Sequence, residues 1–365
     1  MKITRALLLL ACAAVLPAAN AQAAWSDKPV RMVVPFAEGG ASGHVSRRPA
    51  RGNDARPPGF IRVAARELAP YPNKPVRVVV PFPPGGNTDI VARLLAPRLA
   101  EEYGQQFIVD NRGGAGGTVG ADIVARAIPD GYTIIVVAST YASSAALYKL
   151  SYDPVKGIAP VSVITTGPLV VAMNMAVKAN NLKEFIELAR AKPGALNFGS
   201  SGTGSVPHLA IELLRQMSKT DMVHVPYKGD TPALLDLLGG QIQLFSSAPL
   251  VLVPQIMAGK VRGLAVTTEQ RAPTMPDLPA VGEVVPGYSA TTWFGMWAPA
   301  GTPKDIVARL NRSIARIVKL PEVQARLRAD GMEPAHSTPE EFTRFIAGEI
   351  AKWSKVVKTG NIKID

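Results

Sequence analysis

Short apolar runs alternate with amphipathic segments from Pro72 onward, and this alternation constrains the fold more than any other feature of the chain. We predict strands at 76–80, 107–109, 133–137, 161–164, 169–173, 222–225 and 261–266. Helical patterns occur at 88–102, 118–128, 182–192, 206–217, 231–238, 250–257, 304–318, 322–329 and 339–357. Such alternation predicts α/β units built on mostly parallel sheets. We expect Pro97 to kink or shorten the first helix.

The stretch 76–95, VRVVVPFPPGGNTDIVARLL, joins the first strand to the first helix through a turn rich in Pro and Gly. Backbone N–H groups of such a turn can point into a cleft at the helix N-terminus, which suits an anion such as a carboxylate. The pattern begins twice, because 25–40 aligns without gaps to 71–86 with 10 of 16 positions identical. Only the second copy continues into a helix, so we interpret 24–70 as a degenerate, poorly structured partial duplication. An extra strand at 28–36 and a frame error in the gene stay open as alternatives.

The chain is long enough for two domains of ordinary size, with 365 residues of which 47% are hydrophobic and 19% charged. Its formal net charge is +12, of which Lys2 and Arg5 contribute two and residues 41–70 contribute four. Basic residues of 87–365 are scattered, without the clustering and aromatic neighbours of a nucleic-acid surface. The charge is compatible with a small anionic ligand, and we expect no nucleic-acid partner.

The N-terminus has the form of a secretory signal peptide, which we assign to residues 1–23. Two positive side chains precede an apolar run at 6–16, and A-x-A cleavage candidates follow at 19–21 and 21–23. That run is too short to span a bilayer, and no later segment is long enough, so we expect a soluble protein without membrane insertion. A lipid anchor at Cys12 is the alternative. Because Cys12 is the only cysteine, we otherwise expect no disulfide, no thiol nucleophile and no Cys metal ligand.

Four loops with unusual chemistry follow predicted strands: 81–89, 138–144, 199–208 and 245–249. Ligands of open α/β sheets lie outside the carboxyl ends of the strands, so these loops are candidates for a binding site. They offer hydroxyls and backbone N–H groups but few charges. That composition suits the binding and release of a polar solute better than bond making.

The third loop contains GSSGTGS at 199–205, which is rich enough in hydroxyls and glycine to wrap an anionic oxygen. It is not a P-loop, because no Gly-Lys-Ser/Thr closes it. It is not a nucleophile elbow either, because no Ser lies centred between glycines two residues away on each side. Ligand contact and helix capping by Ser205 both stay open, and the two can hold together.

The histidines give no indication of a metal site. His44, His208, His224 and His336 have no metal-ligand spacing, and we expect neither a metal nor another cofactor. His208 lies just inside the helix after 199–205, where it could orient the loop, meet a ligand or be purely structural. We interpret His224 as a structural residue within a strand.

Three other side chains near these loops have an interpretation of their own. Asp89 could bind an amine on a ligand, but we favour an acid at a helix N-terminus. Tyr227 could pack on a ligand, and Asp230 is expected to cap the helix that follows. The segment 111–120, NRGGAGGTVG, fails the dinucleotide motif because Val119 stands where Gly is required, so we predict a close-packed turn.

Several blocks with these residues make 71–365 resemble the Bug (TctC-like) extracytoplasmic solute-binding proteins of tripartite tricarboxylate transporters. The blocks are KPVRVVVPFPPGGNTDIVAR, VDNRGGAGGTVGADIVARAIPDGYT, YDPVKGIAPVS, LNFGSSGTGSVPHLA, VHVPYKGDTPALLDLLGGQIQLF and WFGMWAPAGTP. Their order and spacing are together specific. The resemblance implies a two-domain periplasmic-binding fold that closes on its ligand in a cleft between lobes. It also implies that loop backbone, hydroxyls and bridging waters recognise a small carboxylate.

We expect lobe 1 to comprise 71–165 with 292–365, and lobe 2 to comprise 166–291. The expected ligand contacts of lobe 1 are Phe82, Pro83, Gly85, Gly86, Thr88, Asp89, Ala138 and Ser139. Those of lobe 2 are Ser200, Ser201, Gly202, Thr203, Gly204, Ser205, His208, Tyr227 and Ser246. The implied partners are a small organic anion and the membrane permease of the transporter, and we expect a periplasmic monomer without catalytic activity.

The chain departs from the family pattern in three places. Gly113 stands where the family commonly has Pro, and Ser246 and Ser247 stand where it commonly has Asp-Asn. Without that Asp, a ligand with a positive amine is put in doubt. The segment 25–70 is the third departure.

Two other functions remain open from the sequence. One is a secreted serine hydrolase that uses a Ser of 200–205 with His208, although no acid partner is evident. The other is a non-functional product of a damaged gene, which the duplication suggests.

Overall fold

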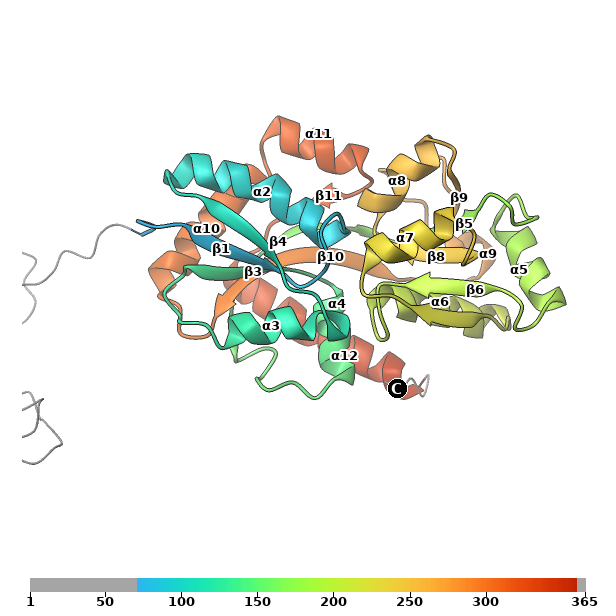
Figure 1. The fold of residues 1–365 in the computed structure, drawn as a ribbon, viewed down its shortest axis with the longest axis horizontal. Helices are drawn as coiled ribbons and strands as arrows, with labels where there is room; N and C mark the ends of the chain where they lie inside the picture. The colour runs from blue at the N-terminus through green and yellow to red at the C-terminus, as the bar shows by residue number, and fades with distance from the viewer. Residues whose placement is uncertain (1–70, 360–365) are drawn as a thin grey trace, which may run out of the picture. The chain divides into compact units, whose positions relative to one another are not determined.

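Two β-sheets organise the part of the chain that the computed structural model describes, residues 71–359 (Figure 1). These residues belong to a unit that spans Ala69–Asp365. The predictions of a signal peptide at 1–23 and of a partial duplication at 24–70 lie outside the described residues.

Within that range, the first sheet is mixed and has six strands in the order β11-β4-β10-β3-β1-β2. They are β1 (Val76–Val80), β2 (Phe107–Asn111), β3 (Thr133–Ala138), β4 (Ile158–Pro168), β10 (Thr291–Pro299) and β11 (Glu333–Pro334). β1 pairs in parallel with β2 and β3, whereas β10 is antiparallel to β3 and β4. Since β1 lies between two strands and is covered on both faces, its sequence VRVVV is an almost unbroken apolar run.

The second sheet, also counted over the described residues, has five strands in the order β7-β6-β8-β5-β9. They are β5 (Val170–Asn174), β6 (Asn197–Ser200), β7 (Val223–Pro226), β8 (Leu244–Ser247) and β9 (Val261–Val266). β6 is parallel to β7 and β8, and β5 is antiparallel to β8 and β9. We call the part around the six-stranded sheet the first lobe and the part around the five-stranded sheet the second lobe.

Helices cover both faces of the first sheet (Figure 1). α2 (Asn87–Tyr103) and α10 (Lys304–Ile317) lie on one face, and α3 (Thr118–Ala125), α4 (Thr140–Leu147) and α12 (Pro339–Thr359) lie on the other, while α11 (Pro321–Ala329) contacts β11. The helical spacing of apolar residues explains this packing. In α10 one side of the helix is buried, and it consists of Ile306, Val307, Leu310, Ser313, Ile314 and Ile317.

The second sheet is covered in the same way. α7 (Asp230–Leu238) and α8 (Pro249–Met257) lie on one face, and α6 (Val206–Ser218) lies on the other (Figure 1). α5 (Leu182–Ala191) contacts the short α9 (Val281–Val284).

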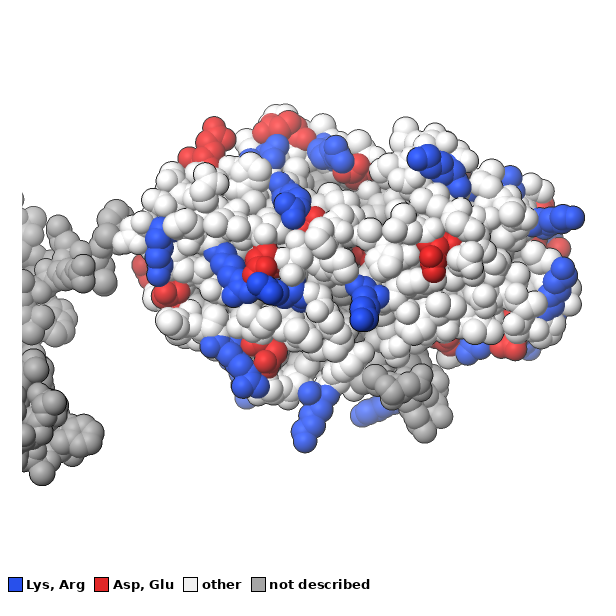
Figure 2. All heavy atoms as spheres, viewed as in Figure 1, with Lys and Arg blue, Asp and Glu red and all other residues white. Residues whose placement is uncertain are grey.

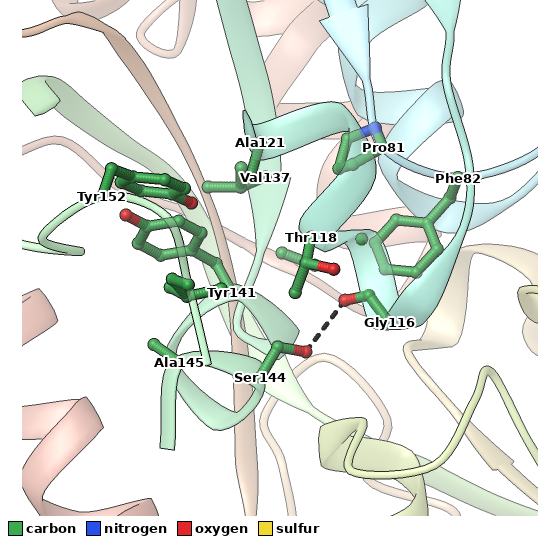
Figure 3. A pocket seen from close by; sticks show the side chains of 13 residues that line it. Pro81, Phe82, Gly116, Thr118, Ala121, Val137, Tyr141, Ser144, Ala145 and Tyr152 are labelled. Carbon is green, nitrogen blue, oxygen red and sulfur yellow. Dashed lines mark hydrogen bonds between the residues drawn. The ribbon is translucent and has the colours of Figure 1, made fainter. Parts of the chain in front are cut away.

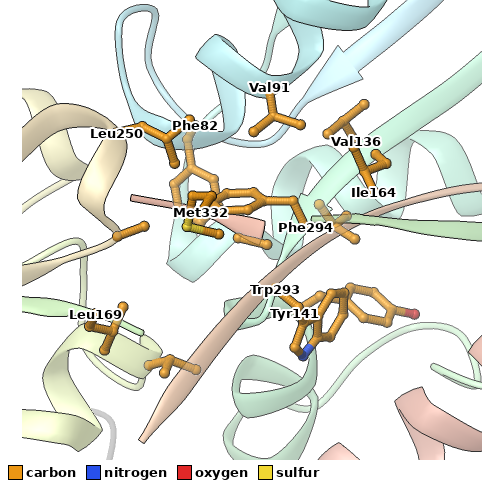
Figure 4. Close-up of a cluster of buried hydrophobic side chains, with 14 of the residues drawn as sticks. Phe82, Val91, Val136, Tyr141, Ile164, Leu169, Leu250, Trp293, Phe294 and Met332 are labelled. Atoms are coloured by element: carbon orange, nitrogen blue, oxygen red, sulfur yellow. The ribbon is translucent and has the colours of Figure 1, made fainter. Parts of the chain in front are cut away.

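One hydrophobic cluster runs through both lobes. Leu169 and Leu250 of the second lobe belong to the same cluster as Phe82, Phe294 and Met332 of the first (Figure 4). A separate cluster, which includes Val170 and Leu237, lies on the α7 and α8 face of the second sheet. The shared cluster means that apolar contacts, as well as polar ones, hold the lobes together in this conformation.

Two connections between the lobes are bonded to one buried residue, Thr267. Leu169 joins β4 to β5, and its N–H donates to Thr267 Oγ1 at 2.8 Å. Ala290 precedes β10, and its carbonyl accepts from Thr267 Oγ1 at 2.8 Å, while its N–H donates to the Thr267 carbonyl at 2.7 Å. The two connections are therefore joined to each other through the hydrogen bonds of Thr267.

The observed architecture confirms the predicted α/β class with two lobes. The prediction of mostly parallel sheets is wrong, because β4, β5, β9 and β10 pair in antiparallel. The long strand β10 was not among the predicted strands, and the predicted loop 138–144 is largely α4. Pro97 does not end α2, which continues to Tyr103.

Charged side chains on the face shown in Figure 2 are mixed, with Lys and Arg lying among Asp and Glu rather than in one basic patch. Among the helices of residues 71–359, none is both long and apolar enough to cross a membrane.

Candidate functional site

The first glycine loop, residues 81–89, leaves the carboxyl end of β1 and turns into α2. Gly85 has a φ of 77°, a conformation that glycine adopts without a steric penalty, and Gly86 is the N-cap residue of α2. Of the predicted ligand contacts in this loop, Gly85 is exposed, Pro83 is half-buried, and the buried ones are Phe82, Gly86, Thr88 and Asp89.

Asp89 holds this loop from inside the first turn of α2. Its Oδ2 accepts from the Gly85 N–H at 2.9 Å and from Arg93 Nε at 2.8 Å, and its Oδ1 accepts from Asn111 Nδ2 at 3.0 Å. Burial alone raises the pKa of the Asp89 carboxyl, but the bonds from Arg93, Gly85 and Asn111 outweigh burial and lower it. Because both oxygens are engaged within the lobe, the geometry favours the structural interpretation of Asp89 over binding of an amine.

A cavity opens beside this loop at the carboxyl edge of the first sheet (Figure 3). Its lining residues, all within the described range, include no charged side chain; those with larger side chains are Phe82, Thr118, Val137, Tyr141, Leu150 and Tyr152. Ser144 Oγ, also in the lining, donates to the Gly116 carbonyl at 2.9 Å. The cavity volume is about 10 Å³, close to the room that one buried water needs. A carboxylate of several carbons can enter only if the surrounding loops or lobes move.

The second glycine loop, residues 199–208, leaves the carboxyl end of β6 and turns into α6. Ser205 Oγ accepts from the His208 N–H at 3.3 Å, so Ser205 is the N-cap, which is one of the two roles that the sequence left open. Thr203 is half-buried, and the buried predicted contacts of this loop are Ser200, Ser201, Gly202, Gly204, Ser205 and His208.

Two stacked imidazole rings form hydrogen bonds with the second glycine loop. The rings of His208 and His224 have centroids 3.8 Å apart. His208 Nδ1 accepts from the Gly204 N–H at 3.1 Å, and His224 Nε2 shares a hydrogen bond with Ser200 Oγ at 2.7 Å. Burial, the neighbouring His224 and the charge of Arg215 lower the pKa of His208 to about 3. Its ring is therefore neutral at physiological pH and orients the loop, which was one of the predicted roles.

The two loop systems meet where the lobes touch. Pro83 of the first lobe lies against Gly229 of the second, since a Cβ on Gly229 would lie only 2.7 Å from Pro83 Cδ. Thr231 Oγ1 donates to the Pro84 carbonyl at 3.1 Å. The Thr203 carbonyl is 3.3 Å from the hydroxyl of Tyr148, which follows α4. Predicted contacts from both lobes therefore lie at one junction.

The remaining predicted contacts are placed as follows. Ala138 lines the cavity, and Ser139 Oγ shares a 2.8 Å hydrogen bond with Thr292. The Tyr227 hydroxyl donates to Asp236 at 2.6 Å. Ser246 is fully buried, and its hydroxyl has no hydrogen-bond partner within the described residues.

The structure adds polar residues at the junction that sequence reasoning missed. Asn87 Nδ2 donates to Ser247 Oγ at 2.8 Å, and Ser247 Oγ donates to Asp230 Oδ1 at 2.8 Å. Asp230 was expected to cap α7, but Gly229 is the N-cap residue, and the Asp230 carboxyl group accepts from Ser247, from Asn87 and from its own backbone N–H. No local sequence signal could have shown this, because Asn87 and Asp230 are distant in the chain.

The turn at 111–120 is close-packed, as predicted. A Cβ on Gly120 would lie 2.7 Å from the Arg112 carbonyl and 2.8 Å from Pro81 Cα. Those atoms leave no space for a side chain. Close packing therefore explains why position 120 is glycine, and no bound dinucleotide is needed to explain it.

The hydrolase alternative finds no support in this geometry. Ser200 pairs with His224 rather than with His208 and is fully buried, and Ser205 bonds the His208 backbone as a cap. Over residues 71–359, no group of His, Cys, Asp and Glu side chains is arranged to hold a metal ion.

Two lobes of this topology, with loops at the carboxyl ends of parallel strands meeting at their junction, define a solute-binding protein of the periplasmic type. The chain belongs to the receptors of the tripartite tricarboxylate transporter family, since the TctC family model matches residues 91–362.

Known proteins are similar to this chain over most of its length. BugT of Bordetella pertussis is 36% identical over 282 residues, which cover 76% of this chain and 86% of BugT. The structure of R. palustris Rpa4515 with adipate has a TM-score of 0.78 and 39% identity, covering 80% of this chain and 99% of that one. MatC from Rhodopseudomonas palustris, solved with bound malate, has a TM-score of 0.74 and 35% identity, covering 79% of this chain and all of that one.

Proposed function

We propose that this chain is a periplasmic receptor that captures a small carboxylate between its lobes and delivers it to the membrane permease of a tripartite transporter. The ligand would be held by the two glycine loops, 81–89 and 199–208, together with Ala138, Tyr227 and Ser246. The lobes that close on it are 71–165 with 292–365 and 166–291. The receptor acts as a monomer and performs no catalysis.

The observation that carries this proposal is the meeting of two glycine-rich loops from different lobes at the carboxyl ends of their strands. Their backbone N–H groups and hydroxyls are donors for an anionic oxygen, and no lining side chain of the adjoining cavity is charged. The buried, unpaired Ser246 hydroxyl is a further donor, because an unpaired buried polar group is costly unless a ligand or water bonds to it. Structures of two family members hold adipate and malate.

Calorimetry of the full chain against a panel of carboxylates tests the proposal. The panel includes adipate, malate and a tricarboxylate, with the diamide of adipate as a neutral control of the same length. We expect at least one carboxylate to bind and the diamide not to bind. Absence of binding by every carboxylate, with an unchanged circular dichroism spectrum, rejects the proposal, and equal binding of the diamide rejects recognition of charge.

A further inference from the structure

Asp230 is a carboxyl group buried at the contact between the lobes. Its side chain belongs to the first turn of α7 in the second lobe and is 7% exposed. A Cβ on Gly86 of the first lobe would lie 3.6 Å from Asp230 Oδ2, so the carboxyl group lies beside the N-terminus of α2 as well as that of α7.

Every group bonded to this carboxyl is uncharged. Ser247 donates from β8, and Asn87 donates from α2 through both its backbone N–H and its side-chain amide. Asn87 also bonds in the other direction, since its Oδ1 accepts from the Val251 N–H of α8 at 3.2 Å. The nearest charged groups of the same helices have other partners: Asp89 of α2 is paired with Arg93, and Asp236 of α7 bonds Tyr227.

In this arrangement, closing the lobes is less favourable in free energy when the Asp230 carboxyl group is ionised. Burial raises the pKa of Asp230, and the hydrogen bonds from Ser247 and Asn87 offset only part of that effect. The two helix N-termini favour a negative charge, but within residues 71–359 no Lys, Arg or His is paired with it, and Lys228, two residues before it, is exposed. When the lobes separate, the contact with Asn87 is lost and water can reach the carboxyl group.

We propose that Asp230, Asn87 and Ser247 form a latch between the lobes, and that the latch closes more readily when the Asp230 carboxyl group carries a proton. This inference rests on the proposed function in one respect, the opening and closing of the lobes around an anion. When the Asp230 carboxyl group is protonated, the latch keeps its hydrogen bonds without burying a charge. The receptor therefore closes more weakly at neutral pH, which favours release of the solute, and more firmly when acidified.

The direction of the pH effect follows from linkage. The pKa of Asp230 is raised in the closed state relative to the ordinary carboxyl value of the open state. The closed state thus takes up the proton first as the pH falls. The gain in closure begins as the pH falls through the raised pKa and is complete below the ordinary one.

Distances between two spin labels in the ligand-free protein test the latch. Ile128 of the first lobe and Met257 of the second are 73% and 81% exposed, so Ile128→Cys and Met257→Cys can carry the labels in a Cys12→Ser background. The variants are Asp230→Ala, Asp230→Asn and, as a matched control, Asp277→Asn, which removes an exposed carboxyl group of the second lobe. Distances are measured in steps from pH 7 down to about pH 4, just above the ordinary carboxyl pKa.

At the low end of the pH series, where the wild-type carboxyl group is protonated, we expect Asp230→Ala to lower the ratio of closed to open molecules about tenfold relative to the wild type, because the Asn87 donors lose their acceptor. The wild type and Asp277→Asn should shift toward short distances as the pH is lowered. Asp230→Asn should be at least as closed as the wild type at pH 7 and should not respond to pH.

Wild-type distances in Asp230→Ala, or a wild-type pH response in Asp230→Asn, would overturn the proposal. If Asp230→Ala fails to fold, the pH response of Asp230→Asn decides alone. Because no ligand is present, a receptor that binds no carboxylate in calorimetry would refute the proposed function without altering this result.

Discussion

The two glycine loops have the same topology but are anchored by different chemistry. Each follows a parallel strand and precedes a helix, β1 to α2 in the first lobe and β6 to α6 in the second. The first is held by an ionised carboxylate, Asp89, bonded to Arg93 and Gly85. The second is held by a neutral imidazole, His208, which accepts from Gly204 and stacks on His224.

The two anchors give the two glycine loops different responses to acid. The pKa of Asp89 is lowered, so its contribution to stability is present above the ordinary carboxyl pKa and is lost only as the pH falls through the lowered value. The pKa of His208 is lowered to about 3, so the unfolded chain takes up a proton below about pH 6.5 while the folded loop does not. Between pH 7 and pH 5 the second loop should weaken and the first should not.

The largest expected effect is a loss of ligand affinity when the two lobes are kept apart at the contact of Pro83 with Gly229. Gly229→Ala adds a Cβ that would lie 2.7 Å from Pro83 across the junction, at a φ of 132° that alanine tolerates poorly. We expect the affinity for the carboxylate identified by calorimetry to fall about 100-fold, since overpacking of this kind costs 1–3 kcal/mol and the backbone strain adds to it. Isothermal titration measures the change.

Gly259→Ala is the matched control for that substitution. Gly259 also has a positive φ, 67°, but nothing lies within 4 Å of an added Cβ. The control should therefore lose stability without a comparable loss of affinity. Equal affinities for the two variants would show that the two loops act independently in binding.

The next effect is the acid response of the second loop. In His208→Asn, Oδ1 can replace Nδ1 as the acceptor for the Gly204 N–H, and it does not take up a proton at pH 5. We expect the wild type to lose about 2 kcal/mol of unfolding free energy between pH 7 and pH 5 through this residue. Urea unfolding at both pH values should show that His208→Asn avoids most of this loss.

His336→Asn provides the control for that prediction. His336 is exposed and lies in the first lobe, so its removal should leave most of the acid response intact. An unchanged response in His208→Asn would show that another group controls the acid stability of the second loop.

The smallest expected effect comes from the first loop. Asp89→Asn keeps the size of the side chain but removes the charge that Arg93 and Gly85 bond. We expect a loss of about 1 kcal/mol at pH 7, because Arg93 is largely exposed and water screens the pair. Thermal unfolding should show the same difference from the wild type at pH 7 and at pH 5, and a difference that shrinks between them would contradict the lowered pKa.

Sequence patterns predicted the strands and helices whose periodicity is local. β1 and β9 match their predicted bounds, and Ser205 caps α6, which is one of the two roles that the sequence left open for it. α4 was missed because TYASSAAL is rich in Ala and Ser and lacks a clear apolar stripe. β10 was not predicted as a strand, and its antiparallel course could not have been predicted either, because the direction of a returning strand depends on the path of the chain and not on its own residues.

The sequence predicted which loops lie at the site, but it did not predict the hydrogen bonds between their side chains. Glycine and hydroxyl content marked 81–89 and 199–208 correctly as segments at strand ends. The link from Ser200 to His224 and the latch at Asp230 join residues that only the fold brings together. The expected roles as ligand contacts stay predictions for all the residues named.

Hydrogen–deuterium exchange of the full chain, with and without its tightest-binding carboxylate, tests directly whether both lobes hold the ligand. Capture of the anion between the lobes predicts that amides of 81–89 and 199–208 slow together, by at least about tenfold, as backbone donors are bonded and the lobes close. Slowing confined to one loop, or no change in either while calorimetry records binding, would contradict the claim that both lobes hold the ligand.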